Sequence, residues 1–112
     1  IIVGTESFIE EETTRSLELP GQAALYQNYP NPFNPSTIIH YDVAEPGMVD
    51  LRVYDVTGDL VRILESRHRE RGRYEAGWNG DNDRAEPVAS GIYFYRMTAP
   101  GYSQTRKMVL VQ

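Results

Sequence analysis

Apolar and polar residues alternate at every second position between residues 37 and 43. Ile39, Tyr41 and Val43 fall on one side of this alternation. A period of two residues is typical of a β-strand that buries one face, so we predict a strand over 37–43. The Pro-Gly pair at the end of 45–47 favours a tight turn directly after it.

The same alternation continues from residue 48 to residue 56. Val49, Leu51 and Val53 alternate there with charged residues, which predicts a second strand with one apolar face. The Thr-Gly-Asp sequence at 57–59 predicts a hairpin turn, because glycine adopts the positive φ that such loops require.

Residues 60–64 are expected to form the returning strand of this hairpin. Leu60, Ile63 and Leu64 also match helical spacing, so a helix is the competing interpretation. We prefer the strand because Gly72 closes the window before a helix could gain a longer apolar stripe.

Three further strands are predicted over 72–78, 91–98 and 106–111, and a polar loop joins the first two of them. The run IYFYRMT at 92–98 combines β-branched and aromatic residues, which is typical of a central strand buried on both sides. Short strands separated by turn signals at intervals of about ten residues indicate an all-β fold, an antiparallel β-sandwich.

The segment that leads into the strand predicted over 37–43 reads YPNPFNPST, from Tyr29 to Thr37. Each of its prolines fixes φ and removes a backbone donor, so the segment cannot form a helix or a central strand. We interpret it as a stiff, extended part of a domain that covers 25–112. Residues 1–24 include three successive glutamates and are interpreted as a linker or the tail of a preceding module.

Composition restricts the possible functions. The chain has 112 residues and no cysteine, which excludes disulfides and thiolate metal sites. Its formal net charge of −5 argues against a partner that is a nucleic acid. Because no apolar run approaches the ~20 residues that span a bilayer, we expect no transmembrane segment.

The chain contains few candidate catalytic residues. Nucleophilic catalysis needs a base within hydrogen-bonding reach of a serine, cysteine or threonine. His40 alternates with apolar residues of its strand and is expected to face solvent, and His68 lies in an arginine-rich connector. Neither histidine lies in a catalytic motif. We therefore expect no catalytic residue, no cofactor and no enzyme activity.

The loop after residue 78 is the one candidate metal site. It contains several oxygen ligands of the kind that Ca²⁺ prefers, namely Asn79, Asp81, Asn82, Asp83 and Glu86. Their spacing does not fit the calcium-binding loop of an EF-hand. We therefore interpret the loop as a set of turns held by hydrogen bonds from side chains to the backbone, and expect no metal.

Two binding functions compete with a structural role for the remaining side chains. Arginines recur from Arg62 to Arg73 and suit an anionic partner, but glutamates alternate with them, which favours a solvated face that protects an edge strand. Trp78 and the tyrosines suit stacking on sugar rings, but aromatic residues in strands usually fill a core.

Four segments carry a family pattern: YPNPFNPSTIIHYDV, VDLRVYDVTGDLVR, WNGDNDRAEPVASGIYFYRM and TRKMVLV. Together they resemble the C-terminal sorting domains of proteins exported by the type IX (Por) secretion system of Bacteroidetes and their relatives. The pattern is also similar to the immunoglobulin-like domain of flagellar hook-capping proteins. The resemblance covers about residues 26–112 and implies an immunoglobulin-like antiparallel β-sandwich of about seven strands.

The resemblance also implies a function. In this family the folded domain directs a passenger protein through the periplasm and the outer membrane to the cell surface or the medium. The implied partners are the outer-membrane type IX secretion machinery, its sorting peptidase and the N-terminal passenger domain. The family's motif of a lysine followed by apolar residues matches the proposed sorting signal, Lys107, Met108, Val109, Leu110 and Val111.

We expect the last strand to present this signal at a sheet edge whose unpaired backbone groups are available to a further strand. Two alternatives remain open. One is a carbohydrate-binding accessory module of a polysaccharide-degrading enzyme, and the other is a purely structural immunoglobulin-like spacer. The precursor sequence upstream of Ile1 would discriminate between the three functions.

Overall fold

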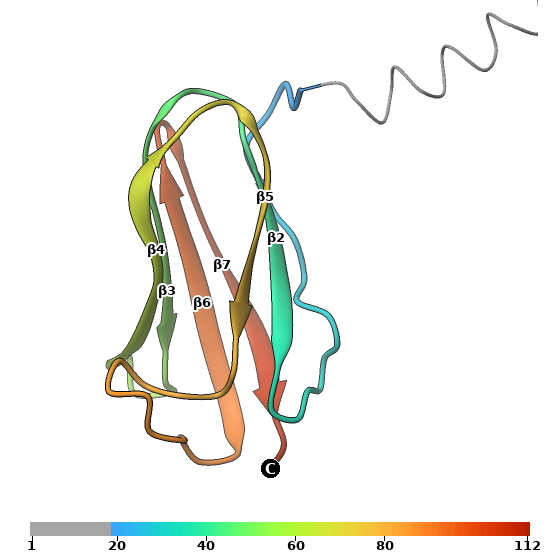
Figure 1. Ribbon diagram of the computed structural model, residues 1–112, viewed down its shortest axis with the longest axis vertical. Coiled ribbons are helices and arrows are strands. Elements are labelled where there is room, and N and C mark those ends of the chain that lie inside the picture. Colours follow the sequence, from blue (N-terminus) through green and yellow to red (C-terminus); the bar gives the residue numbers. More distant parts are fainter. Residues whose placement is uncertain (1–18) are drawn as a thin grey trace, which may run out of the picture.

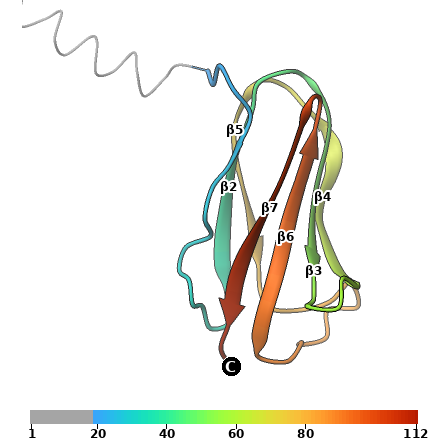
Figure 2. The same ribbon diagram turned by 180° about the vertical axis from the view of Figure 1, so that it is seen from behind.

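Two antiparallel sheets pack face to face in the computed structural model, which describes residues 19–112 (Figures 1 and 2). Of the predicted linker over 1–24, the part up to residue 18 lies outside the described residues. One sheet has the order β1-β2-β5, with β1 (Ala24–Leu25), β2 (Thr37–Val43) and β5 (Gly72–Trp78). The other has the order β4-β3-β6-β7, with β3 (Gly47–Tyr54), β4 (Leu60–Arg69), β6 (Gly91–Ala99) and β7 (Tyr102–Leu110). The predicted immunoglobulin-like β-sandwich is confirmed.

The alternation that predicted the first two strands is confirmed in β2 and β3. The residues on the apolar side of the pattern are fully buried between the sheets: Ile39, Tyr41, Val43, Val49, Leu51 and Val53. The turn at 45–47 carries the chain from one sheet to the other, so β2 and β3 belong to opposite layers. A two-residue period therefore fixed which side chains form the core of each layer.

The hairpin after β3 is confirmed, and the helical alternative over 60–64 is wrong. Gly58 has a φ of 90° in the turn, and β4 returns antiparallel to β3. The prediction that His68 lies in a connector is also wrong. β4 continues through His68 to Arg69, whose register partner is Gly47. The local sequence of 65–69 does not predict a strand. These residues form one because their backbone groups pair with those of β3.

The prediction that 91–98 is buried on both sides is wrong. Tyr95 and Met97 are completely buried in β6, whereas Ile92 is 41% exposed and Arg96 is exposed. The strand is central in the sense that β3 and β7 flank it, but a two-layer sandwich leaves the outer face of each sheet uncovered. Its aromatic run therefore divides between the core and the surface.

Trp78 lies at the centre of an aromatic cluster in the core. Only 1% of the residue is exposed, and its ring centroid lies 5.6 Å from that of Phe33 and 5.3 Å from that of Tyr93. Tilted and edge-on aromatic pairs at such distances are favourable. The expectation that Trp78 fills the core is confirmed, and Phe33 joins the segment before β2 to the same cluster.

Candidate functional site

The predicted sorting signal lies at the end of β7, an edge strand of the four-stranded sheet. Among the described strands, β7 pairs with β6 alone, from Tyr102 opposite Ala99 to Leu110 opposite Gly91. Lys107 to Leu110 form the end of the strand, and Val111 follows it directly. The signal is therefore part of the folded sheet.

Side chains of the signal alternate between the core and the surface. Met108 is 0% exposed and Leu110 is 1% exposed, and both belong to the hydrophobic core. Lys107 is exposed, Val109 is half-buried and Val111 is 48% exposed. Of the five predicted signal residues, a partner that binds the folded domain can contact only these three side chains directly.

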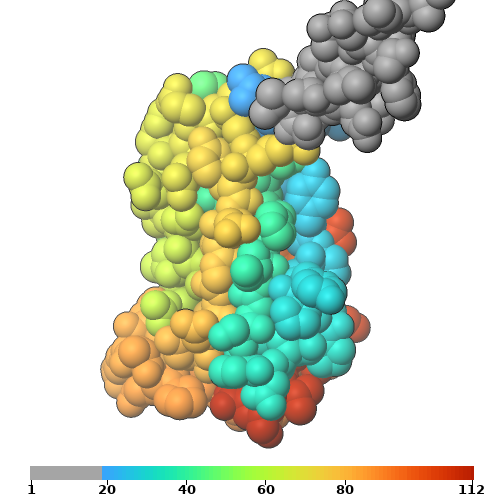
Figure 3. Space-filling model, turned by 45° about the vertical axis from the view of Figure 1, so that its right-hand side comes forward, coloured from blue at the N-terminus to red at the C-terminus, as the bar shows by residue number. Residues whose placement is uncertain are grey.

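A proline-rich strap, residues 27–36, covers the outer edge of β7 at the signal. The N–H of Phe33 donates to the carbonyl of Val109 at 3.0 Å, and the N–H of Val111 donates to the carbonyl of Phe33 at 2.9 Å. The N–H of Val109 donates to Oδ1 of Asn31 at 3.0 Å. Figure 3 shows this segment in cyan beside β2, with parts of the last strand in red next to it.

Further contacts secure the same edge. Nε2 of Gln27 donates to the carbonyl of Lys107 at 2.8 Å, and Nε of Arg106 donates to the carbonyl of Leu25 at 2.6 Å. The carbonyls of Lys107 and Val109 and the N–H groups of Val109 and Val111 are therefore already bonded to the segment before β2. Our expectation that the edge at 107–111 is available to a further strand is wrong, because the strap occupies it.

Tyr95 fixes the beginning of the strap from inside the sandwich. Its hydroxyl donates to the carbonyl of Tyr26 at 2.7 Å and accepts from the N–H of Asn28 at 2.8 Å. Burial raises the pKa of Tyr95, so the hydroxyl keeps the proton that it donates. Asn28 is itself only 2% exposed and donates through Nδ2 to Oγ1 of Thr37 at 3.0 Å. The strap is thus held by buried polar contacts at one end and by Phe33 further along.

Sequence reasoning did not find the strap residues that contact the signal. Gln27, Asn31 and Phe33 lie far from β7 in the chain, and no local pattern predicts a contact over such a separation. The one available clue was Phe33 itself, which apart from the prolines is the one residue of 27–36 whose side chain has no polar group. An apolar side chain in that setting indicates an anchor that points inward.

The interpretation of the acidic loop as hydrogen-bonded turns is confirmed. Oδ1 of Asn82 accepts from the N–H groups of Arg84 and Glu86, at 2.9 and 3.1 Å. The Asp81 carboxylate lies 3.0 Å from Nη1 of Arg62, so a cation from the protein already neutralises it. Within residues 19–112, no group of three or more His, Cys, Asp or Glu residues could hold a metal ion.

Both histidines lie at the surface beside glutamates. Nε2 of His40 lies 3.1 Å from Glu75, and Nδ1 of His68 lies 3.3 Å from Glu70, with every one of these side chains more than half exposed. In the described part of the chain, no serine or threonine hydroxyl bonds to either imidazole. Residues 19–112 contain no helix that is long and apolar enough to cross a membrane.

Comparisons with known proteins support this description of the fold. Residues 39–102 match the family described as the FlgD Ig-like domain. The structure of dimeric latent PorU from Porphyromonas gingivalis is similar, with 25% identity and a TM-score of 0.61 over 83% of this chain and 10% of PorU. No match to a curated protein was found.

A second similar structure is that of PorZ, an essential bacterial surface component of the type IX secretion system of Porphyromonas gingivalis. Identity is 22% and the TM-score is 0.51, over 80% of this chain and 11% of PorZ. At this identity the similarity shows the fold alone. The chain spans about a tenth of the length of either structure.

Proposed function

Since the chain belongs to the FlgD Ig-like domain family, we propose that it is a non-catalytic C-terminal sorting domain of a type IX secretion passenger. In this proposal the domain directs the passenger that precedes it through the periplasm and the outer membrane to the cell surface or the medium. Its partners are the outer-membrane secretion machinery and the sorting peptidase. The same fold occurs in PorZ, a component of that secretion system, which makes the system the natural place to test the proposal.

The observation that carries the proposal is that the side chains of the motif at the end of β7 alternate between the core and the surface. Met108 and Leu110 anchor it in the core, while Lys107 and Val111 point their side chains outward. In this proposal the machinery reads the signal on the folded domain, where the side chains of Met108 and Leu110 are covered and those of Lys107 and Val111 are accessible. Because the strap occupies the backbone edge, we propose that the secretion machinery binds a composite surface made of these outward side chains and the strap.

The test uses the full precursor in its native host. Deleting residues 107–112 is expected to leave the passenger in the periplasm, which fractionation and immunoblotting would measure. Because that deletion also removes core side chains, Lys107→Gln provides the sharper test. Lys107 is exposed, so this variant is expected to reduce export while the melting temperature of the domain stays unchanged.

Arg84→Gln is the matched control, because it makes the same charge change at an exposed loop residue away from β7. It is expected to leave export unchanged. Unaltered extracellular passenger after the 107–112 deletion would contradict the proposal and favour a structural spacer. Loss of export with Leu110→Ala but not with Lys107→Gln would mean that the motif is needed only for folding.

A further inference from the structure

The outer face of the four-stranded sheet carries three consecutive cross-strand pairs of related side chains. β3 and β6 are neighbours in the interior of this sheet, and their outward residues stand directly opposite one another. The pairs are Tyr54 with Phe94, Arg52 with Arg96, and Asp50 with Thr98. The face therefore changes from an aromatic row, through a cationic row, to a row of oxygen-bearing side chains.

The two arginines of the cationic row are not fully neutralised by the protein. Nη2 of Arg52 lies 3.2 Å from Oδ1 of Asp50, whereas Nε of Arg96 donates to the neutral Oγ of Ser103 at 3.2 Å. Among residues 19–112, no carboxylate forms an ion pair with Arg96. Like charges directly opposite each other on a sheet are destabilising. The row therefore has a net positive charge that an anionic ligand would compensate.

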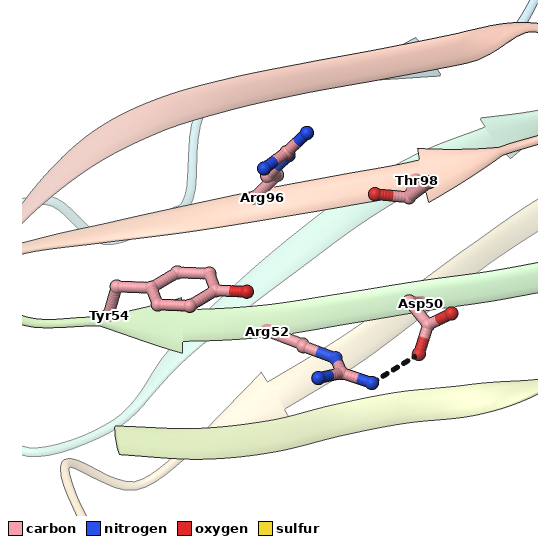
Figure 4. A pocket seen from close by; sticks show the side chains of 5 residues that line it. All are labelled: Asp50, Arg52, Tyr54, Arg96 and Thr98. Atoms are coloured by element: carbon pink, nitrogen blue, oxygen red, sulfur yellow. Dashed lines mark hydrogen bonds and ion pairs between the residues drawn. The ribbon is translucent and has the colours of Figure 1, made fainter. Parts of the chain in front are cut away.

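A shallow hollow of about 220 Å³ lies over these rows and is lined by the five residues drawn in Figure 4. In this view the Tyr54 ring lies along β3 and its hydroxyl points toward the hollow, between side chains of both strands. A second depression of about 460 Å³ adjoins it, because Tyr54 and Arg96 line both. Val56 and Phe94 add apolar surface to the second depression.

The mixture of side chains restricts the class of ligand. Guanidinium groups bind carboxylates through paired hydrogen bonds, and aromatic rings bury flat apolar surface. The Asp50 carboxylate and the Thr98 hydroxyl suit ligand hydroxyl groups. Because β3 and β6 are inner strands, their backbone cannot pair with a peptide, so a ligand here is bound through side chains alone.

We propose that this face binds an acidic polysaccharide built of uronic acid rings. Arg52 and Arg96 bind the carboxylates, while Tyr54 and Phe94 contact the apolar faces of the sugar rings. Asp50 accepts hydrogen bonds from the sugar hydroxyls. Since the whole chain carries a net charge of −5, binding depends on this local cationic row and weakens as salt concentration rises.

The experiment titrates the full chain with oligogalacturonate and with a neutral oligogalactose of equal length, using calorimetry and NMR shifts at low and high salt. We expect binding of the acidic oligomer alone. Arg52→Gln with Arg96→Gln is expected to weaken it at least about tenfold. Arg96→Lys keeps the charge but loses the paired hydrogen bonds, so its affinity is expected to be intermediate.

Two control variants each remove one arginine charge from another part of the surface. Arg67→Gln and Arg84→Gln alter exposed arginines outside this face and are expected to leave the affinity unchanged. The proposal would be overturned by no binding of the acidic oligomer, by equal binding of the neutral oligomer, or by an equal loss of affinity in the control variants. Tighter binding of a polyglutamate peptide at the same residues would also overturn it, in favour of an acidic protein partner.

Discussion

Phe33 and Leu110 form a parallel β-bridge, which joins the proline-rich strap to the last strand. Phe33 makes both backbone hydrogen bonds of this bridge, to Val109 and Val111, and its ring packs on Trp78. The strap and the proposed signal are therefore one structural unit. A change in the strap is expected to alter the surface that the secretion machinery would meet.

Phe33→Ala is expected to destabilise the domain by about 3–5 kcal/mol, because Phe33 is only 2% exposed and its loss leaves a cavity beside Trp78. Urea unfolding followed by Trp78 fluorescence would measure the change. Tyr29→Ala is the matched control, since it removes an aromatic ring from the same strap at a residue that is 79% exposed. Equal destabilisation by the two variants would show that the Phe33 anchor has no special role.

Gly80→Ala is expected to cost more stability than Gly58→Ala. Both glycines have positive φ, 69° and 90°, so alanine at either position costs about 1–2 kcal/mol of backbone strain. At Gly80 a Cβ would also lie 3.3 Å from Leu110 Cδ1 and from the Pro35 carbonyl, whereas at Gly58 it would meet nothing within 4 Å. Melting temperatures of the two variants would test this, and a lower value for Gly58→Ala would contradict it.

Unfolding free energy is expected to decrease between pH 10 and pH 12 because of Tyr41. Burial, and secondarily the charge of Glu65, raises the pKa of Tyr41 from 10.0 to about 12. The unfolded chain thus loses this proton at lower pH than the folded chain. The stabilising contribution is complete below pH 10 and is lost as pH rises through 12, a change on the order of 2–3 kcal/mol.

Urea unfolding at a series of alkaline pH values would measure the slope of the unfolding free energy against pH. Tyr41→Phe is expected to reduce it. The part that remains comes from Tyr26, whose pKa is raised by its hydrogen bond with Asp42, and from Tyr93 and Tyr95, whose pKa values are raised by burial. An unchanged slope in Tyr41→Phe would contradict the assignment to Tyr41.

Limited proteolysis is expected to cut first on the N-terminal side of Leu25, which is the domain boundary that the sequence predicts. Ala24, opposite Asp42, is the first residue of the described chain whose backbone is paired in a strand. Paired backbone resists proteases more than unpaired backbone does. Mass spectrometry of the first fragment would locate the cut, and a first cut within 37–112 would show that the predicted boundary is wrong.

Sequence alone determined the positions of β2, β3 and β5, the core faces of β2 and β3, and the turn that follows β3. Val49, Leu51 and Val53 were placed correctly because burial of one strand face imposes a two-residue period that any short window contains. Gly58 marked its turn for an equally local reason, the positive φ that the hairpin requires. The motif at 107–111 was likewise visible as a run of residue types, and its role in sorting stays a prediction.

Only the tertiary structure decided which edges and faces of the sheets are covered. The pairing of Phe33 with β7 removed the expected free edge, and the position of β6 in a two-layer sandwich left Phe94 half-buried and Arg96 exposed beside the β3 side chains. Neither result follows from local pattern, because each depends on residues distant in sequence whose backbone groups and apolar surfaces must be satisfied together. Periodicity shows that a strand has a buried side, whereas the packing of the whole chain determines what its other side and its edge contact.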